Sequence, residues 1–343
     1  MSIRAKFSNF HDKIKLHRED EAYKDARIKD DSILADIKKS FKDAGYKVND
    51  SFLQGSFSTS TAVKHPEHDF DIDRAIVISV DDAPEDPVEP KKKVLDVLEK
   101  RGFKNAKIKK PCTTADYLGL NLHIDIIIYR ESNENYELAV GKKNSSDQNK
   151  EWSSSDPKGL RDWINDNSNY IGSSNSKLAQ YKRVVRYLKR WRDNKFSESV
   201  AKKIYSIGLT IMAKEQFMPD LDNEGRVNDL ESLRNTVNAM LNASYFLSQG
   251  NSQYEVQVYL PKSPYRDVFD GSSVDTGTQL YNKLTTLRNK LEKAIAEDKL
   301  KVQCEILQDI FGSDFEVPES DKSNTTKKVA YSSAGAVGTS QGA

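Results

Sequence analysis

Apolar residues change their spacing near residue 170 of the 343-residue chain. Before that point, segments 69–80 and 118–129 are dense in Ile, Val and Leu, and their length and β-branched content are typical of strands. After it, Leu, Val and aromatic residues recur every three or four positions, as in 178–194, which is typical of helices. The pattern predicts an α+β lobe over 1–170 and a helical lobe over 171–318.

The first lobe contains several shorter predicted elements. Residues 9–28 are compatible with a helix, and a second helix is expected to start at a cap formed by Asp31 or Ser32 and to end at Gly45. Its apolar stripe consists of Ile33, Leu34, Ile37 and Phe41. A short strand, a further helix and a polar loop are predicted over 52–55, 91–101 and 130–160, respectively.

The second lobe and the tail differ sharply in composition. Helical patterns cover four segments, 178–194, 204–217, 227–248 and 276–311. Residues 319–343 have almost no apolar content, so they bury too little surface to fold, and we expect a disordered tail.

Charge and cysteine content exclude several classes of protein. Lys and Arg number 53 and Asp and Glu 52, and this balance disfavours a protein that coats nucleic acid. A local basic cleft for a small phosphorylated ligand remains compatible with it. Two cysteines, Cys112 and Cys304, are too few for a disulfide framework or a structural zinc site. The polar N-terminus and the lack of a long apolar run predict a cytoplasmic protein without a membrane span.

The candidate chemistry lies in two acidic strands. Asp71 and Asp73 are two positions apart in one predicted strand and therefore share a face, and Asp125 lies in the other. If these strands pair, the three carboxylates cluster, and such a cluster needs a cation. Asp69 lies on the same face and is an alternative partner for Asp71. The pair Asp71 and Asp73 is preferred because the strand continues directly from it.

Oxygen ligands of this kind select Mg²⁺, which binds through a few carboxylates together with substrate phosphates. Two such ions activate a ribose hydroxyl and stabilise leaving pyrophosphate. Upstream, Gln54-Gly55-Ser56 forms a turn in which glycine permits close backbone approach to a phosphate and serine donates to it. His123 alternates with Asp125 on its strand and is expected to orient a neighbouring side chain.

Basic side chains form a second candidate feature. Lys182, Arg186 and Lys189 lie at i, i+4 and i+7, hence on one helix face. This face is either an ordinary solvated surface or a cationic wall for a triphosphate. Ser206 precedes an apolar helix, where it would serve as an N-cap or donate to a phosphate. The pair at 65 and 68 in HPEH lacks further ligands at zinc spacing.

Four motifs together resemble a known family. QGSFSTST, DFDID, HIDIII and VVRYLKRW are similar to the cGAS/DncV-like bacterial nucleotidyltransferases, the CD-NTases of CBASS anti-phage defence, over about residues 30–318. The resemblance implies a polymerase-β-like nucleotidyltransferase lobe with a mixed β-sheet, a helical lobe, an active site in the cleft between them and an N-terminal helix that braces both.

The resemblance also implies an activity, which is the joining of nucleoside triphosphates such as ATP or GTP into a cyclic di- or trinucleotide. Asp71, Asp73 and Asp125 would hold two Mg²⁺ ions, with Mn²⁺ as a substitute. The remaining implied nucleotide contacts are Gln54, Gly55, Ser56, Lys182, Arg186, Lys189 and Ser206.

Two further expectations concern partners and alternatives. Some family members have a flexible C-terminus that an E1/E2-like enzyme conjugates, which implies Ala343 as the conjugated residue. The alternative function is a linear nucleotidyltransferase that extends an RNA or protein acceptor. A catalytically inactive binding module is disfavoured because all three acids are intact.

Overall fold

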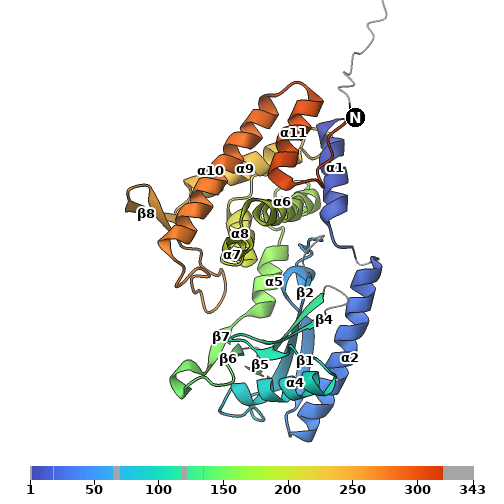
Figure 1. Cartoon of the computed structure of the whole chain (residues 1–343), viewed down its shortest axis with the longest axis vertical. Coiled ribbons are helices and arrows are strands. Elements are labelled where there is room, and N and C mark those ends of the chain that lie inside the picture. The colour runs from blue at the N-terminus through green and yellow to red at the C-terminus, as the bar shows by residue number, and fades with distance from the viewer. Residues whose placement is uncertain (1, 18, 65–69, 118–121, 134, 320–343) are drawn as a thin grey trace, which may run out of the picture.

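A computed structural model describes residues 2–17, 19–64, 70–117, 122–133 and 135–319. Two N-terminal helices lie along the side of the molecule, α1 (Ile3–Ile14) against the helical lobe and α2 (Glu21–Asp43) against the sheet (Figure 1). Phe7 and Phe10 of α1 enter the aromatic core of the helical lobe, with ring centroids 5.4 and 5.5 Å from that of Tyr187. The N-terminal segment therefore contacts both lobes.

The predicted span 9–28 and the predicted start of the second helix are wrong, whereas its predicted end at Gly45 is confirmed, since Gly45 follows the last turn of α2 with φ +82°. The chain leaves α1 after Ile14, and α2 then runs without interruption through Asp31 and Ser32. Both polar residues are tolerated inside the helix because arginines contact them: Arg74 donates to Asp31 and Arg101 donates to Ser32. They are not caps.

A seven-stranded mixed sheet forms the first lobe, in the order β1-β2-β5-β4-β3, with β6 added to β5 and β7 to β6. β2 and β5 are parallel and the other pairs are antiparallel. Helices α2 and α4 (Val88–Lys100) cover one face. The strands are β1 (Val48–Leu53), β2 (Phe70–Ser79), β3 (Lys107–Ile108), β4 (Thr113–Tyr117), β5 (Leu122–Ser132), β6 (Asn135–Val140) and β7 (Glu151–Ser155).

The loop predicted over 130–160 is wrong, because this segment contains β6, a short 3-10 turn (Asp147–Asn149) and β7. β6 alternates buried Tyr136 and Leu138 with more exposed neighbours, a period of two that its polar flanks conceal. β7 is rich in serine, and only pairing with β6 decides its strand conformation.

The second lobe is built around α6 (Ser174–Lys195), which is buried along most of its length. The other helices are α5 (Pro157–Asn165), which leads in from the sheet, α7 (Glu198–Ala201), α8 (Ser206–Glu215), α9 (Asp229–Asn242), α10 (Val274–Ala296) and α11 (Leu300–Phe311). The predicted helix over 227–248 ends early, at Asn242, and the chain enters the hairpin of β8 (Phe246–Gly250) and β9 (Gln253–Val256). The single helix predicted over 276–311 is two helices separated by extended residues at 297–299.

The expected α+β class with a mixed sheet and a helical lobe is confirmed. In the described part of the chain, none of the helices combines the length and apolar character that a membrane crossing requires. Residues 65–69, which include the HPEH histidines and Asp69, lie outside the described residues, as does the chain beyond residue 319.

A buried ion pair attaches α2 to the back of β2. Asp30 is fully buried, and Arg74 approaches it with Nε 3.1 Å from Oδ1 and with Nη2 in contact with Oδ2. Arg27 donates to the same carboxylate at 2.7 Å. Because Arg74 follows Asp73 in the strand, this pair holds the strand from the face opposite the carboxylates.

Removing one partner of this pair should be costly, because it leaves the other charge buried and uncompensated. We expect Asp30→Ala to lower the free energy of unfolding by about 3–5 kcal/mol, measured by urea denaturation. Asp31→Ala is the matched control: its side chain is 57% exposed and its loss should cost less than about 1 kcal/mol. Equal losses for the two variants would contradict this account of the pair.

Candidate active site

Two central strands bring the acidic residues together. β2 and β5 run parallel in a register that places Asp73 opposite Asp125 and Asp71 opposite His123. Because alternate residues of a strand share a face, these four side chains lie on the same side of the sheet. The intervening Ile72 is fully buried on the other side, in the core beneath α2 and α4. The expected pairing of the two acidic strands is therefore present.

Carboxylate crowding is strongest at Asp73. Burial, together with the negative charges of Asp71 and Asp125, raises the pKa of Asp73 from an ordinary 3.8 to about 7. Like charges forced together in this way gain most from a cation placed between them. Asp73 is therefore the member of the trio that most requires a counter-charge.

The negative charge of Asp125 has positively charged neighbours at one of its two carboxylate oxygens. Its Oδ1 is buried and has no hydrogen-bond partner, although His123 Nε2 lies 3.1 Å away and Lys109 Nζ lies 3.8 Å away. Burial acts to raise the pKa of Asp125, but the contact with His123 and its positive charge outweigh burial and lower that pKa. This oxygen can coordinate a cation, and such coordination would offset the free-energy cost of burying a polar atom without a hydrogen bond.

His123 itself is held by several neighbours. Burial acts to lower its pKa, but contacts with Asp125 and Asp116 raise the pKa of His123 to about 9. The imidazole is therefore a cation at neutral pH, and it supplies part of the positive charge that the acidic strands need.

The acidic trio fits a divalent cation in its donor chemistry. Carboxylate oxygens are the ligands that Mg²⁺ prefers, and Mg²⁺ completes its shell with waters and substrate phosphates. Over the described residues, no three His, Cys, Asp or Glu side chains already converge as a metal site. The raised pKa of Asp73 and the orphaned oxygen of Asp125 nevertheless show that this group of side chains lacks positive charge.

A glycine turn packs directly against the acids. Gly55 opens the short helix α3 (Gly55–Ser58) with φ +62°, and the backbone N–H of Gln54 donates to the Asp73 carbonyl at 2.9 Å. A Cβ at position 55 would lie 2.0 Å from Asp73 Oδ2. Glycine is therefore required both by the left-handed backbone and by the closeness of Asp73.

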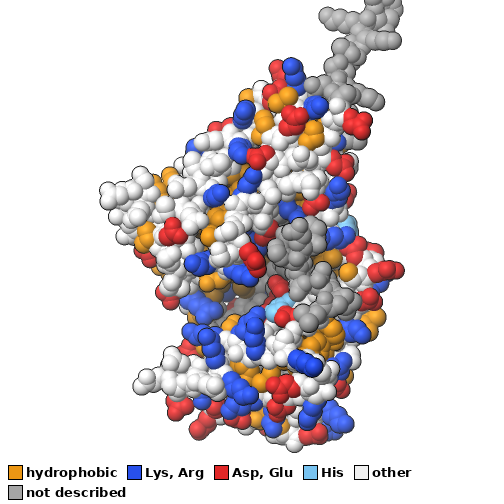
Figure 2. All heavy atoms as spheres, in the orientation of Figure 1, with side chains coloured by type: hydrophobic (Ala, Val, Ile, Leu, Met, Phe, Trp, Pro, Cys, Tyr) orange, Lys and Arg blue, Asp and Glu red, His pale blue; other side chains and the backbone are white. Residues whose placement is uncertain are grey.

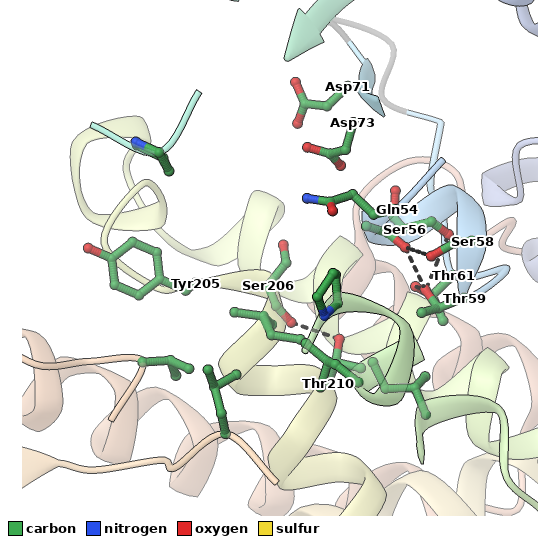
Figure 3. A pocket seen from close by; sticks show the side chains of 18 of the residues that line it. Gln54, Ser56, Ser58, Thr59, Thr61, Asp71, Asp73, Tyr205, Ser206 and Thr210 are labelled. Carbon is green, nitrogen blue, oxygen red and sulfur yellow. Dashed lines mark hydrogen bonds between the residues drawn. The ribbon is translucent and has the colours of Figure 1, made fainter. Parts of the chain in front are cut away.

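Asp71, Asp73 and the glycine turn line one large cavity of about 1120 Å³ between the lobes. In Figure 3, Asp71, Asp73 and Gln54 lie on one side of it, and Tyr205 and Ser206 lie on the other. Figure 2 shows Lys and Arg side chains on both sides of the hollow. The basic residues of the lining are Lys110, Arg161, Lys189, Arg192, Lys202, Lys262 and Arg266.

The structure places the sequence-predicted residues unequally. Asp71, Asp73, Gln54, Gly55, Ser56, Lys189 and Ser206 line the cavity. Asp125 lies one strand away from Asp73 and is outside the lining. Lys182 and Arg186 are also outside it, and Ala343 lies outside the described residues.

The basic face of α6 has a structural task that the sequence interpretation did not anticipate. Arg186 donates to the carbonyls of Ser60 and Ala62, and Lys189 donates to the Thr61 carbonyl at 3.0 Å. Arg190 donates to the carbonyl of Lys64. This face therefore clamps the 60–64 segment that follows the glycine turn, and burial lowers the pKa of Lys189 to about 7.

Ser206 is the first residue of α8, while Tyr205 occupies the N-cap. Arg192 donates to the Ser206 hydroxyl at 2.7 Å, so the two cavity-lining groups form one unit. Sequence reasoning missed Arg192, which lies one turn beyond Lys189 and could have been found by helical spacing. Arg266 and Lys262 lie on a loop of the second lobe, and no local pattern marks them.

Comparisons with known proteins agree with this geometry. Residues 1–168 match the family described as the Second Messenger Oligonucleotide or Dinucleotide Synthetase (SMODS) domain. The structure is similar to that of the CD-NTase CdnG of Bradyrhizobium diazoefficiens in complex with GTP, with a TM-score of 0.67, 17% identity and coverage of 92% of this chain and 96% of that one. This family match covers just under half of the chain, and the structural similarity extends over both lobes.

Two further proteins to which the chain is similar are named as synthases. A Cyclic GMP-AMP synthase of Escherichia albertii is 30% identical over 172 residues, which cover 48% of this chain and only 36% of that protein. Vibrio cholerae DncV cyclic AMP-GMP synthase, in complex with the linear intermediate 5′ pppA(3′,5′)pG, has a TM-score of 0.60 and 17% identity, covering 92% of this chain and 88% of that one. The two lobes of this chain therefore have the polymerase-β-like nucleotidyltransferase fold of these structures.

Gly55 offers a test of the packing against Asp73. We expect Gly55→Ala to destabilise the protein more than Gly45→Ala by at least about 1 kcal/mol, because only Gly55 adds a clash to the left-handed backbone. Gly45 has φ +82° but nothing within 4 Å of the added Cβ. Urea denaturation of both variants measures the difference, which should disappear for Gly55→Ala combined with Asp73→Ala. Persistence of the difference in that background would refute the clash.

The pKa of Asp73 predicts how Mg²⁺ affects stability. A folded-state pKa raised to about 7 means that protonated Asp73 stabilises the fold at low pH and that this stabilisation is lost as pH rises through 7. Mg²⁺ must displace that proton, so the rise in Tm on adding Mg²⁺ should be larger at pH 8 than at pH 6. Thermal unfolding with and without Mg²⁺ checks this, and Asp73→Asn should abolish the pH dependence. The same dependence in Asp73→Asn would contradict the assignment.

Proposed function

We propose that this chain is a CD-NTase, which joins nucleoside triphosphates into a cyclic di- or trinucleotide and releases pyrophosphate. The proposal rests on one observation: the pairing of β2 with β5 brings Asp71, Asp73 and Asp125 together beside a cavity that is lined by basic side chains. Acidic groups for a divalent cation and basic groups for phosphates thus occur at one place, which is the requirement of nucleotidyl transfer.

Each residue has a role in this proposal. When bound, two Mg²⁺ ions, or Mn²⁺ as a substitute, would supply charge neutralisation and activation of the attacking hydroxyl. Asp71 and Asp73 would hold both ions. Asp125 would hold the ion at the attacking hydroxyl and, through its carboxylate, favour loss of the hydroxyl proton.

The donor triphosphate would lie along the glycine turn. Gly55 permits a phosphate to approach the backbone, and the hydroxyls of Ser56 and Ser206 face the same cavity. Arg192 and Lys189 would add positive charge from the second lobe. Tyr205, 43% exposed in the cavity wall, presents a ring on which a base would stack.

Cavity size favours a reaction between nucleotides over modification of a macromolecule. About 1120 Å³ exceeds the roughly 300–1,000 Å³ of common small-molecule sites, which leaves room for two nucleotides. The Vibrio cholerae relative was solved with a linear intermediate of two nucleotides. A linear nucleotidyltransferase acting on RNA would instead need an extended basic surface, and the near-zero net charge disfavours one.

Three finer parts belong to the same proposal. They are an anti-phage role, a cytoplasmic location and an E1/E2-like enzyme that acts on the C-terminus at Ala343. They rest on the family resemblance and on composition.

Product analysis tests the function. We expect the purified protein, incubated with radiolabelled nucleoside triphosphates and Mg²⁺ and then with phosphatase, to yield a phosphatase-resistant cyclic product identified by mass spectrometry. Asp71→Asn combined with Asp73→Asn should lower product formation to below about a thousandth of wild type, because the cation loses its ligands. Asp96→Asn, an exposed carboxylate on α4, is the control and should have no effect.

Two outcomes would contradict the proposal. A phosphatase-sensitive or acceptor-linked product would favour the linear nucleotidyltransferase. Retained turnover in the double variant, at the level of Asp96→Asn, would refute the assignment of the acids.

A further inference from the structure

A row of polar side chains in mutual contact lies beside the acidic trio. The row begins at Asn105, continues through Asp116 of β4 and His123 of β5, and ends at Asp125. Asn105, Asp116 and His123 are outside the cavity lining, and they connect to the site only through Asp125.

The far end of the row is rigidly held. The Asn105 side-chain amide donates to the Asp116 carboxylate and to its carbonyl, each at 3.2 Å, and Asn105 Oδ1 accepts from the Asp116 backbone N–H at 3.3 Å. Asp116 in turn contacts Nδ1 of His123, its direct register partner across the β4–β5 pair. One edge of the imidazole is thereby fixed in place.

The other edge of the imidazole faces Asp125. His123 Nε2 lies 2.6 Å from Thr114 Oγ1 and 3.1 Å from Asp125 Oδ1. Thr114 is the register partner of Asp125, so the ring occupies the space between two neighbouring positions of β4 and β5. The Asp125 side chain cannot rotate toward β4 without meeting this ring.

Such a constraint matters because Asp125 faces Asp73 across the parallel pair. Repulsion between the two carboxylates favours rotation of Asp125 away from Asp73. Lys109 is the other cation beside Asp125 Oδ1, at 3.8 Å, but its side chain is 39% exposed and flexible in type. His123, at 17% exposure and held at both nitrogens, is the rigid one.

We propose that His123, braced by Asp116, is a positioning residue that holds the Asp125 carboxylate in the orientation in which Asp125 and Asp73 share a divalent cation. The proposal rests on the proposed metal-dependent function. Partners behind a metal ligand fix its orientation in this way, and their loss lowers metal affinity or activity by about 10–100-fold.

Two substitutions at one position separate the two edges of the ring. In His123→Asn the amide nitrogen can replace Nδ1 and keep the contact with Asp116, whereas in His123→Gln it can replace Nε2 and keep the contact with Asp125. We expect His123→Asn to weaken Mn²⁺ binding, followed by electron paramagnetic resonance without nucleotide, by about 10–100-fold. Its kcat should fall in parallel while KM for the nucleotide stays within about twofold.

His123→Gln should recover a large part of both losses, and Asp116→Asn should fall between the two. Tm is measured for every variant, and His17→Asn, a partly exposed histidine far from the acids in sequence, is the control. The proposal is overturned if His123→Asn and His123→Gln lose Mn²⁺ affinity equally, if kcat falls only in step with Tm, or if wild type binds no Mn²⁺.

Failure of this inference can be told apart from failure of the proposed function. Weakened Mn²⁺ binding in His123→Asn, with no cyclic product from wild type, would support the positioning role and refute the function. Cyclic product from wild type, with unchanged Mn²⁺ binding in His123→Asn, would refute the positioning role alone.

Discussion

The parallel pairing of β2 with β5 forces carboxylates together at the centre of the molecule. Its register sets Asp73 opposite Asp125 because the apolar residues between the acids, including Ile72, are buried on the other face. A shift of one residue would exchange the two faces and expose the core. Burial of the apolar face therefore fixes the acids at a separation at which they repel, and the protein surrounds them with cationic and rigid groups.

Several contacts hold this crowded arrangement in place. Arg74 and Asp30 anchor β2 to α2 from behind, and Gly55 packs against Asp73 from the cavity side. From the second lobe, Arg186 and Lys189 donate hydrogen bonds to backbone carbonyls that follow the glycine turn. The two lobes are thus joined through the segment that carries the turn, so the position of the helical lobe and the shape of the cavity depend on each other.

The basic groups around the acids have different partners. His123 contacts Asp125, and the basic side chains of α6 that hold the 60–64 segment donate to backbone carbonyls. The basic side chains that line the cavity come from both lobes, and these are the groups suited to a triphosphate. A net charge of +1 is compatible with this arrangement because acidic and basic groups are separated over a few side chains within one site.

Local pattern was sufficient for the two acidic strands, for their apolar faces and for the glycine turn, because strand alternation and left-handed backbone are properties of neighbouring residues. It was insufficient for β7, whose serine-rich segment becomes a strand only by pairing with β6, and for α2, whose interior Asp31 is stabilised by arginines. Long-range partners decided the rest. They bound Arg186 to the backbone carbonyls after the glycine turn, brought Arg266 to the cavity and set His123 against Asp125, since tertiary contacts join residues that no sequence period relates.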